Sequence, residues 1–120
     1  MPRTSSRKVV VTGLGIVSPV GIGIADAWAS ILAGKSGIGP ITRFDAGPFS
    51  SRIAGEVRNF DVGQWLNAKE ARRFDTFIHY GLAAGIDALK DSGLDLEKVD
   101  REMVGVRSEE HTSELPSHSF

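Results

Sequence analysis

Three cations lie at helical spacing in the middle of the chain. Lys69, Arg72 and Arg73 occupy positions i, i+3 and i+4, so they share one face of the helix that the surrounding sequence predicts. Close cations on one helix face suit an acidic helix or a phosphate group on a partner. A solvated surface with Glu70 and Asp75 nearby would explain the same pattern. The three residues are therefore a candidate binding site that needs support beyond their spacing.

Two glycine-containing motifs look like nucleotide-binding sequences but depart from the patterns that such sites need. Residues 13–15 (Gly-Leu-Gly) follow an apolar run, yet the dinucleotide fingerprint requires a further glycine where Ser18 stands. Residues 34–36 (Gly-Lys-Ser) come after a predicted helix, whereas the phosphate-binding loop with this ending precedes its helix. We predict no cofactor, and a nucleotide-binding oxidoreductase is the disfavoured alternative.

Nucleophiles and metal ligands are scarce in the sequence. The 120 residues include no cysteine, so the chain offers no thiolate nucleophile and no thiolate metal site. His79 lies in a predicted helix, where we expect a surface or packing residue and not a catalyst, and His111 and His118 lie in the tail without metal-ligating neighbours. We predict no catalytic residue and no metal site in this chain. The net charge of −1 argues against nucleic acid or a membrane as a partner.

The elements that would position these residues alternate between strand and helix. Hydrophobic periodicity and breaker residues predict the elements in order. They are a strand over 8–12, a helix over 24–33 followed by Gly34 in a left-handed conformation, a loop over 36–49, a weak strand over 52–57, a helical turn over 61–66 capped by Asp61, a long helix over 69–92 ended by Gly93, and a strand over 103–106. This order predicts an α/β fold with a layered sheet and right-handed crossovers. No apolar run reaches the roughly 20 residues of a membrane-spanning helix, and no signal peptide is evident, so we expect a cytoplasmic protein.

Apolar residues at helical spacing predict the buried faces. We expect Trp28 and Trp65 in the core. The long helix carries a predicted buried stripe of Phe74, Phe77, Ile78, Leu82, Gly85, Ile86 and Leu89. Small residues make this helix thin enough for another backbone to approach closely, namely Gly81, Ala83, Ala84, Gly85 and Ala88.

Three segments together resemble a known enzyme family. They are residues 9–21 (Val-Val-Val-Thr-Gly-Leu-Gly-Ile-Val-Ser-Pro-Val-Gly), residues 32–38 (Leu-Ala-Gly-Lys-Ser-Gly-Ile) and Phe44-Asp45. This pattern resembles the amino-terminal segment of β-ketoacyl-[acyl-carrier-protein] synthases, the type II condensing enzymes of the thiolase-like family. The resemblance implies a layered α/β/α/β/α fold, of which residues 1–106 would be the N-terminal segment.

The resemblance also implies a function for the parent protein. Such an enzyme joins an acyl group to malonyl-acyl carrier protein by decarboxylative Claisen condensation in fatty acid elongation, and it is an acyltransferase. Its cysteine and two histidines would lie beyond this chain, which we therefore expect to be inactive alone. Acyl carrier protein is the implied partner, docked by the basic positions that match Lys69, Arg72 and Arg73, and a homodimer is implied for the full-length parent. Ala68 stands where the family often has another basic residue.

Two alternatives stay open for the function. The chain could derive from a polyketide-type condensing enzyme, or it could be a non-catalytic module that binds carrier proteins.

Residues 107–120 have no periodicity and few large apolar groups, so we expect a disordered tail. Residues 107–115 resemble one translated frame of a sequencing adapter, which predicts that the tail is not native protein.

Overall fold

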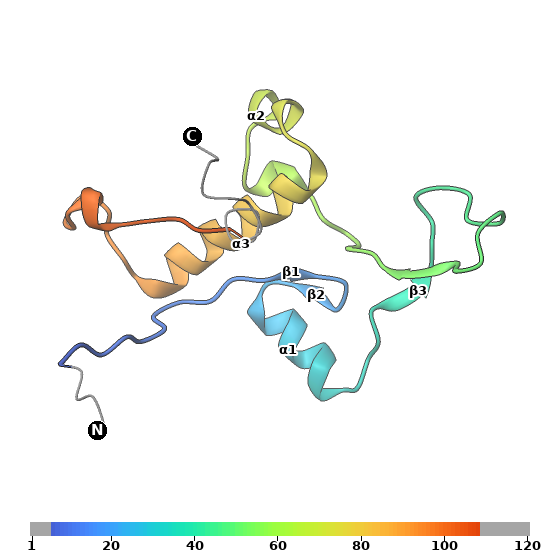
Figure 1. The fold of residues 1–120 in the computed structure, drawn as a ribbon, viewed down its shortest axis with the longest axis horizontal. Coiled ribbons are helices and arrows are strands. Elements are labelled where there is room, and N and C mark those ends of the chain that lie inside the picture. Colours follow the sequence, from blue (N-terminus) through green and yellow to red (C-terminus); the bar gives the residue numbers. More distant parts are fainter. Residues whose placement is uncertain (1–5, 109–120) are drawn as a thin grey trace, which may run out of the picture.

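The computed structural model describes residues 6–108 and shows a mixed α/β segment (Figure 1). Its order is β1 (Val17–Ser18), β2 (Gly21–Ile22), α1 (Ile24–Leu32), β3 (Ile38–Pro40), β4 (Ile53–Gly55), the 3₁₀ turn η1 (Val62–Gln64), α2 (Ala68–Arg73), α3 (Thr76–Ser92) and the 3₁₀ turn η2 (Arg101–Met103). Most of the predicted tail, residues 109–120, lies outside the described residues, so the expectation of disorder there is not tested.

The strands form two separate antiparallel pairs. In the first pair Val17 lies opposite Ile22, and the chain reverses through the two residues between the strands. In the second pair Ile38 lies opposite Gly55. The weak strand predicted over 52–57 is present as β4. The segment 36–49 is predicted to be a loop, but it contains the short strand β3. Within residues 6–108 the expected layered sheet with crossovers is not formed.

The strands predicted over 8–12 and 103–106 do not form in the described part of the chain. Residues 8–12 run as extended chain without a paired neighbour in the described part, and Val9 is 96% exposed (Figure 1). Residues 104–106 likewise form no strand, the predicted start of that strand lies in η2, and Val106 is 89% exposed. A strand exists only through hydrogen bonds to a neighbour, and residues 6–108 supply no such neighbour for either apolar run.

The sequence predicts one helix over 69–92, and this prediction is wrong because the structure has two helices there, α2 and α3. Phe74 ends α2 in an extended conformation, with φ −122° and ψ 147°. Asp75 is also extended and occupies the N-cap position of α3, a position that aspartate favours. Gly93 ends α3 with φ 70°, as the sequence predicts.

Two local predictions of helical ends are confirmed. Gly34 follows α1 with φ 69°, and its N–H donates to the Ile31 carbonyl at 3.0 Å. The Lys35 N–H donates to the Ser30 carbonyl at 2.9 Å, which completes a Schellman motif. At the other predicted turn, the Asp61 side chain accepts a hydrogen bond from the Gly63 N–H at 3.0 Å and caps η1.

Small residues make the closest contact between distant segments. The backbone at Gly13 and Gly15 lies against α3, so a Cβ added at Gly15 would lie 2.8 Å from the Ala88 nitrogen and overlap the Ala84 carbonyl. A Cβ added at Gly13 would lie 2.6 Å from the Ser92 nitrogen. The predicted close approach of another backbone to this helix is therefore confirmed.

Large apolar side chains contribute little to the buried interior. The buried apolar residues of the described part are Ala27, Ala46 and Ala83. Trp28 is 57% exposed, so its expected place in the core is wrong, and Trp65 is only half-buried. The expected stripe is only partly confirmed, because Ile78 and Ile86 are half-buried while Phe77 is 60% exposed. Its other large members are also exposed: Phe74, Leu82 and Leu89.

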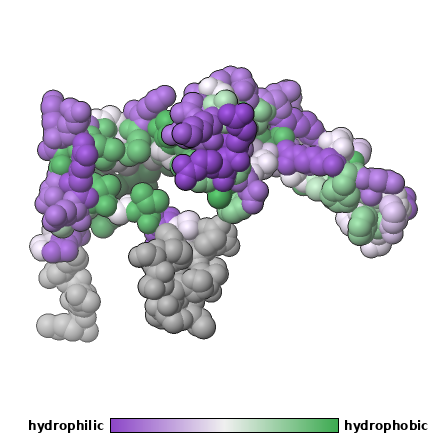
Figure 2. All heavy atoms as spheres, turned by 90° about the horizontal axis from the view of Figure 1, so that it is seen from above, coloured by the Kyte–Doolittle hydropathy of each residue, from purple (hydrophilic) through white to green (hydrophobic). Residues whose placement is uncertain are grey.

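The chain is far more open than a compact domain of its size. Its accessible surface is 10221 Å², whereas a compact monomer of this mass exposes about 6,300 Å². Its radius of gyration is 18.3 Å, against about 14 Å for a compact domain of this length. Figure 2 shows an arched molecule with apolar side chains on its surface. These faces are suited to contact with further protein.

Candidate functional site

The three candidate cations lie on α2. Lys69, Arg72 and Arg73 are all exposed, and all three belong to this single short helix, so the division of the longer helix does not separate them. The ion pairs found within residues 6–108, Arg43–Glu56 and Lys98–Asp95, do not involve them. The structure thus brings together a cationic surface, which we call the basic face.

Contacts at both ends hold α2 in place. The Asn67 side chain accepts a hydrogen bond from the Glu70 N–H at 2.9 Å and caps the helix. Near the other end, the Arg73 guanidinium carbon lies 6.0 Å from the centre of the Phe74 ring, the outer limit of a cation–π contact. The His79 ring, on α3, lies with Nε2 at 2.8 Å from the Ala71 carbonyl. His79 therefore packs, as the sequence predicts.

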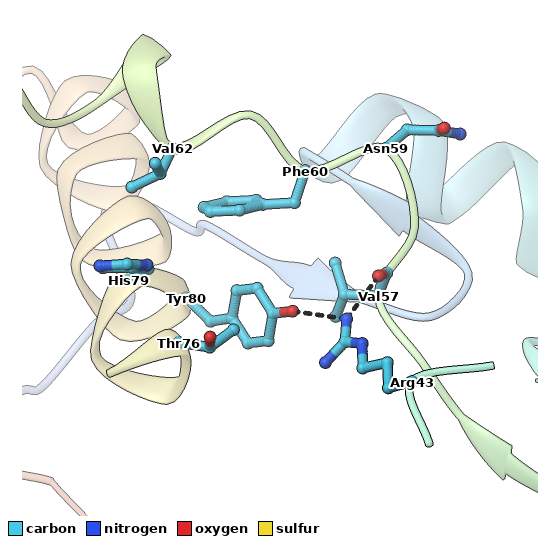
Figure 3. Close-up of a pocket in the computed structure, with 8 residues that line it drawn as sticks. All are labelled: Arg43, Val57, Asn59, Phe60, Val62, Thr76, His79 and Tyr80. Carbon is cyan, nitrogen blue, oxygen red and sulfur yellow. Dashed lines mark hydrogen bonds between the residues drawn. The ribbon is translucent and has the colours of Figure 1, made fainter. Parts of the chain in front are cut away.

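A cavity of about 430 Å³ lies beside the first turns of α3 (Figure 3). Arg43 reaches it from the β3–β4 loop, and its Nη2 donates to the Tyr80 hydroxyl at 2.8 Å and to the Val57 carbonyl at 2.9 Å. Asn59, on its rim, adopts φ 61°, a left-handed conformation that asparagine tolerates. These bonds tie the loop to α3, and we assign them a structural role.

Glu56 is the buried charged residue of this region. Its carboxylate accepts hydrogen bonds from the Thr42 hydroxyl at 2.9 Å and the Thr42 N–H at 3.1 Å, and the Arg43 Nε lies 3.8 Å away. Burial tends to raise the pKa of Glu56, but the hydrogen bonds from Thr42, a backbone bond from Arg43 and the Arg43 charge together hold the pKa below its usual value. Glu56 is thus held as an anion that organises the loop.

Aromatic contacts fix the segment between β4 and α2. The Trp65 indole N–H donates to the Asp87 carboxylate at 3.0 Å. The Phe60 ring stacks on Trp65 at 5.1 Å and meets Tyr80 edge-on at 5.0 Å. Since Asp87 and Tyr80 both belong to α3, these contacts fasten the segment that leads into α2. Sequence analysis missed this role for Trp65.

Two kinds of site are not found among the described residues, namely a cluster of metal ligands and a membrane-spanning helix. Within residues 6–108 no three histidine, aspartate or glutamate side chains converge as a metal site requires. His111 and His118 lie outside the described residues. None of the helices in this part of the chain combines the length and apolarity needed to cross a membrane. The basic face is the arrangement here that best suits recognition of a charged partner.

Comparison with known proteins defines the class of the chain. The family model described as the β-ketoacyl synthase N-terminal domain matches residues 6–110, so the chain belongs to the β-ketoacyl synthase family. The β-ketoacyl-[acyl-carrier-protein] synthases are transferases.

Particular relatives narrow that class to one kind of synthase. The chain is 50% identical over 102 residues to 3-oxoacyl-[acyl-carrier-protein] synthase 2 of Vibrio cholerae, an alignment that covers 85% of this chain and 25% of the relative. It is 42% identical over 106 residues to the protein of the same name from Synechocystis, covering 88% of this chain and 26% of the relative. The chain thus spans about a quarter of the length of the curated relatives that it matches. It is homologous to the N-terminal region of these enzymes.

A solved structure agrees with this assignment. The ishigamide ketosynthase/chain length factor matches with a TM-score of 0.67 and 36% sequence identity, over 75% of this chain and 22% of the matched one. The mixed α/β arrangement of the chain therefore corresponds to part of a thiolase-like ketosynthase.

Proposed function

We propose that the parent protein of this chain catalyses decarboxylative Claisen condensation between an acyl group and malonyl-acyl carrier protein in fatty acid elongation. We propose further that the basic face, Lys69, Arg72 and Arg73, docks the acidic carrier protein. The observation that carries the docking role is the exposure of all three cations on one anchored helix. The names of the relatives support the choice of carrier, because these relatives are acyl-carrier-protein synthases.

The chemical step belongs to residues outside this chain. In such a condensation a cysteine thiolate accepts the acyl group, two histidines assist the decarboxylation of the malonyl group, and backbone N–H groups hold the oxyanion. The chain contains no cysteine, and His79 is engaged with a backbone carbonyl. The chain alone is therefore inactive in this proposal, and its contribution is structure and docking.

Electrostatics gives the docking a measurable signature. Each exposed ion pair contributes roughly 0.2–1 kcal/mol, so three of them change affinity by an amount that is easily measured. Such pairs are screened by salt, because the Debye length falls to about 10 Å at 0.1 M ionic strength. Carrier affinity should therefore decline with salt, and it should decline less when the basic face is neutralised.

A polyketide-type condensing enzyme is the second candidate for the parent. The structural match to the ishigamide ketosynthase/chain length factor favours it. The 50% identity to a 3-oxoacyl-[acyl-carrier-protein] synthase 2, against 36% to that structure, favours fatty acid elongation. Product analysis separates them, because an elongating enzyme that works with reductive partners yields saturated chains and a polyketide enzyme retains keto groups.

The test uses a full-length synthase that carries this segment. It is built by joining residues 6–106 of this chain to the remaining sequence of the Vibrio cholerae relative, and we call it the full-length synthase. We expect Lys69→Ala/Arg72→Ala/Arg73→Ala to lower kcat/KM for malonyl-acyl carrier protein roughly tenfold. The matched control, Lys35→Ala/Lys90→Ala/Lys98→Ala, removes the same charge elsewhere. Equal activity of the two variants would refute docking by the basic face.

The native extent of the segment is a separate proposal. We propose that residues 1–106 are the N-terminal segment of the synthase domain and that residues 107–120 are non-native. Sequencing the source locus past the Val106 codon tests this. An open frame that continues into a cysteine and two histidines is the expected result, and the same final 14 residues in the genome would contradict it.

A further inference from the structure

At the end of α2, the Ala71 carbonyl lacks the hydrogen-bond donor that it would have in a continuous helix. In an uninterrupted helix the Ala71 carbonyl would accept the N–H of Asp75, four residues along. Phe74 and Asp75 are extended instead, with ψ 147° and ψ 163°, so that N–H is turned away. The Phe74 N–H lies 3.5 Å from the Ala71 carbonyl, which is too long for a strong bond.

His79 supplies the missing donor. Its Nε2 lies 2.8 Å from the Ala71 carbonyl. A carbonyl oxygen only accepts, so Nε2 must carry the hydrogen and donate. Among the side-chain hydrogen bonds within residues 6–108, this one joins α2 to α3.

We propose that His79 is a positioning residue for carrier docking, holding the basic face at a fixed angle to α3. The proposal rests on the docking role assigned to the basic face above. A helix of six residues does not sustain itself in water. Its Asn67 cap and its Arg73–Phe74 contact lie within or next to α2 and cannot set its direction relative to α3. The Trp65–Asp87 bond fastens the segment before α2 to α3, and the His79 bond joins α2 itself to α3 from a half-buried ring.

Two substitutions at one position separate the hydrogen bond from side-chain bulk. In the full-length synthase, His79→Leu removes the donor, and His79→Gln keeps an N–H donor of similar reach. We expect His79→Leu to raise KM for malonyl-acyl carrier protein roughly two- to tenfold, the range of one ordinary hydrogen bond, with kcat unchanged. We expect His79→Gln to restore most of the loss. Tyr80→Phe is the matched control, because the Tyr80 hydroxyl meets Arg43 and not α2.

Amide hydrogen exchange gives a readout independent of turnover. We expect His79→Leu to speed exchange in a peptide covering residues 67–75, because α2 loses its tether, and Tyr80→Phe to leave that exchange unchanged. A His79→Leu variant with a normal KM would overturn the proposal whatever its exchange, and so would a variant with normal exchange in residues 67–75. Equal impairment of His79→Leu and His79→Gln would also overturn it, since side-chain packing would then be the cause.

The docking role and the positioning role fail in different ways. If neutralising the basic face raises KM and His79→Leu does not, the positioning role is wrong and the docking role stands. If neutralising the basic face has no effect, the docking role is wrong, and the function assigned to His79 falls with it.

Discussion

At the scale of single residues, Glu56 is the group whose charge the fold controls most directly. Two bonds from Thr42 and the nearby Arg43 stabilise its ionised form, so its pKa lies below the usual value in the folded protein. A carboxyl whose pKa is lowered on folding stabilises the protein above its unfolded pKa, and this stabilisation is lost as the pH falls through its folded pKa.

The variant Glu56→Gln tests this linkage. We expect the full-length synthase to be more stable than Glu56→Gln at neutral pH, by a margin that shrinks once the pH falls below about 4.5, the usual pKa of glutamate. Urea unfolding of both proteins across that pH range measures the margin. A margin that stays constant to low pH would show that the charge of Glu56 contributes nothing.

Residue spacing predicted the basic face but not the contacts around the cavity. Lys69, Arg72 and Arg73 are close in sequence, so any helix through them brings them together, and the structure does so. Arg43 and Tyr80 are 37 residues apart, and their hydrogen bond depends on how the β3–β4 loop meets α3. No local pattern carries that information, because it arises only from packing between distant elements.

At the scale of elements, the division between α2 and α3 shows two sequence signals in competition. The apolar spacing over residues 69–92 is continuous and predicts one helix. The cap signals predict two, since Asn67 is followed three residues later by Glu70, and Asp75 precedes Thr76. Asn67 forms its capping hydrogen bond, whereas the Asp75 side chain forms none. The division lies at the extended backbone of Phe74 and Asp75, and exposed members of the apolar stripe such as Phe77 contribute little to hold a longer helix.

The N-cap of α2 can be tested by substitution. We expect Asn67→Ala to destabilise α2 by about 1 kcal/mol and to speed amide exchange in residues 68–73 of the full-length synthase. Asn67→Ser keeps an oxygen acceptor for the Glu70 N–H and should behave like the unchanged protein. If Asn67→Ala and Asn67→Ser exchange alike, the cap does not set the stability of this helix.

The contact of the glycine segment with α3 makes a second prediction at this scale. We expect Gly15→Ala to destabilise the full-length synthase by roughly 1–3 kcal/mol, because the new methyl group would overlap the Ala84 carbonyl. Gly85→Ala is the control on the same helix, since the added Cβ would meet no described atom within 4 Å beyond the neighbouring backbone of its own helix. Thermal unfolding of both variants measures the difference, and an unchanged Gly15→Ala would contradict the close approach.

At the scale of the whole molecule, the sequence predicted a mixed α/β segment and the family resemblance, and both are confirmed. It also predicted strands over 8–12 and 103–106, and neither forms within residues 6–108. A strand forms only when a neighbouring strand pairs with it, whereas an apolar run in the sequence indicates only that the segment is suited to burial. The exposed Val9 and Val106 therefore mark faces that the chain does not cover by itself.

This exposure predicts the behaviour of the isolated 120-residue chain. We expect it to lack a cooperative thermal transition and to bind an apolar dye such as ANS, because its large apolar side chains are mostly exposed. The full-length synthase should melt cooperatively and bind little dye. Calorimetry and dye fluorescence compare them, and a sharp transition of the isolated chain as a monomer would contradict the inference from its open surface.

The most direct test of carrier docking is the salt dependence of binding. Calorimetric titration gives Kd for acyl carrier protein with the full-length synthase and with Lys69→Ala/Arg72→Ala/Arg73→Ala, from low to high ionic strength. Docking through α2 requires Kd to rise steeply with salt in the unchanged protein. In the triple variant it requires a Kd about tenfold weaker at low salt and a shallower salt dependence. Identical affinities with identical salt slopes would contradict it.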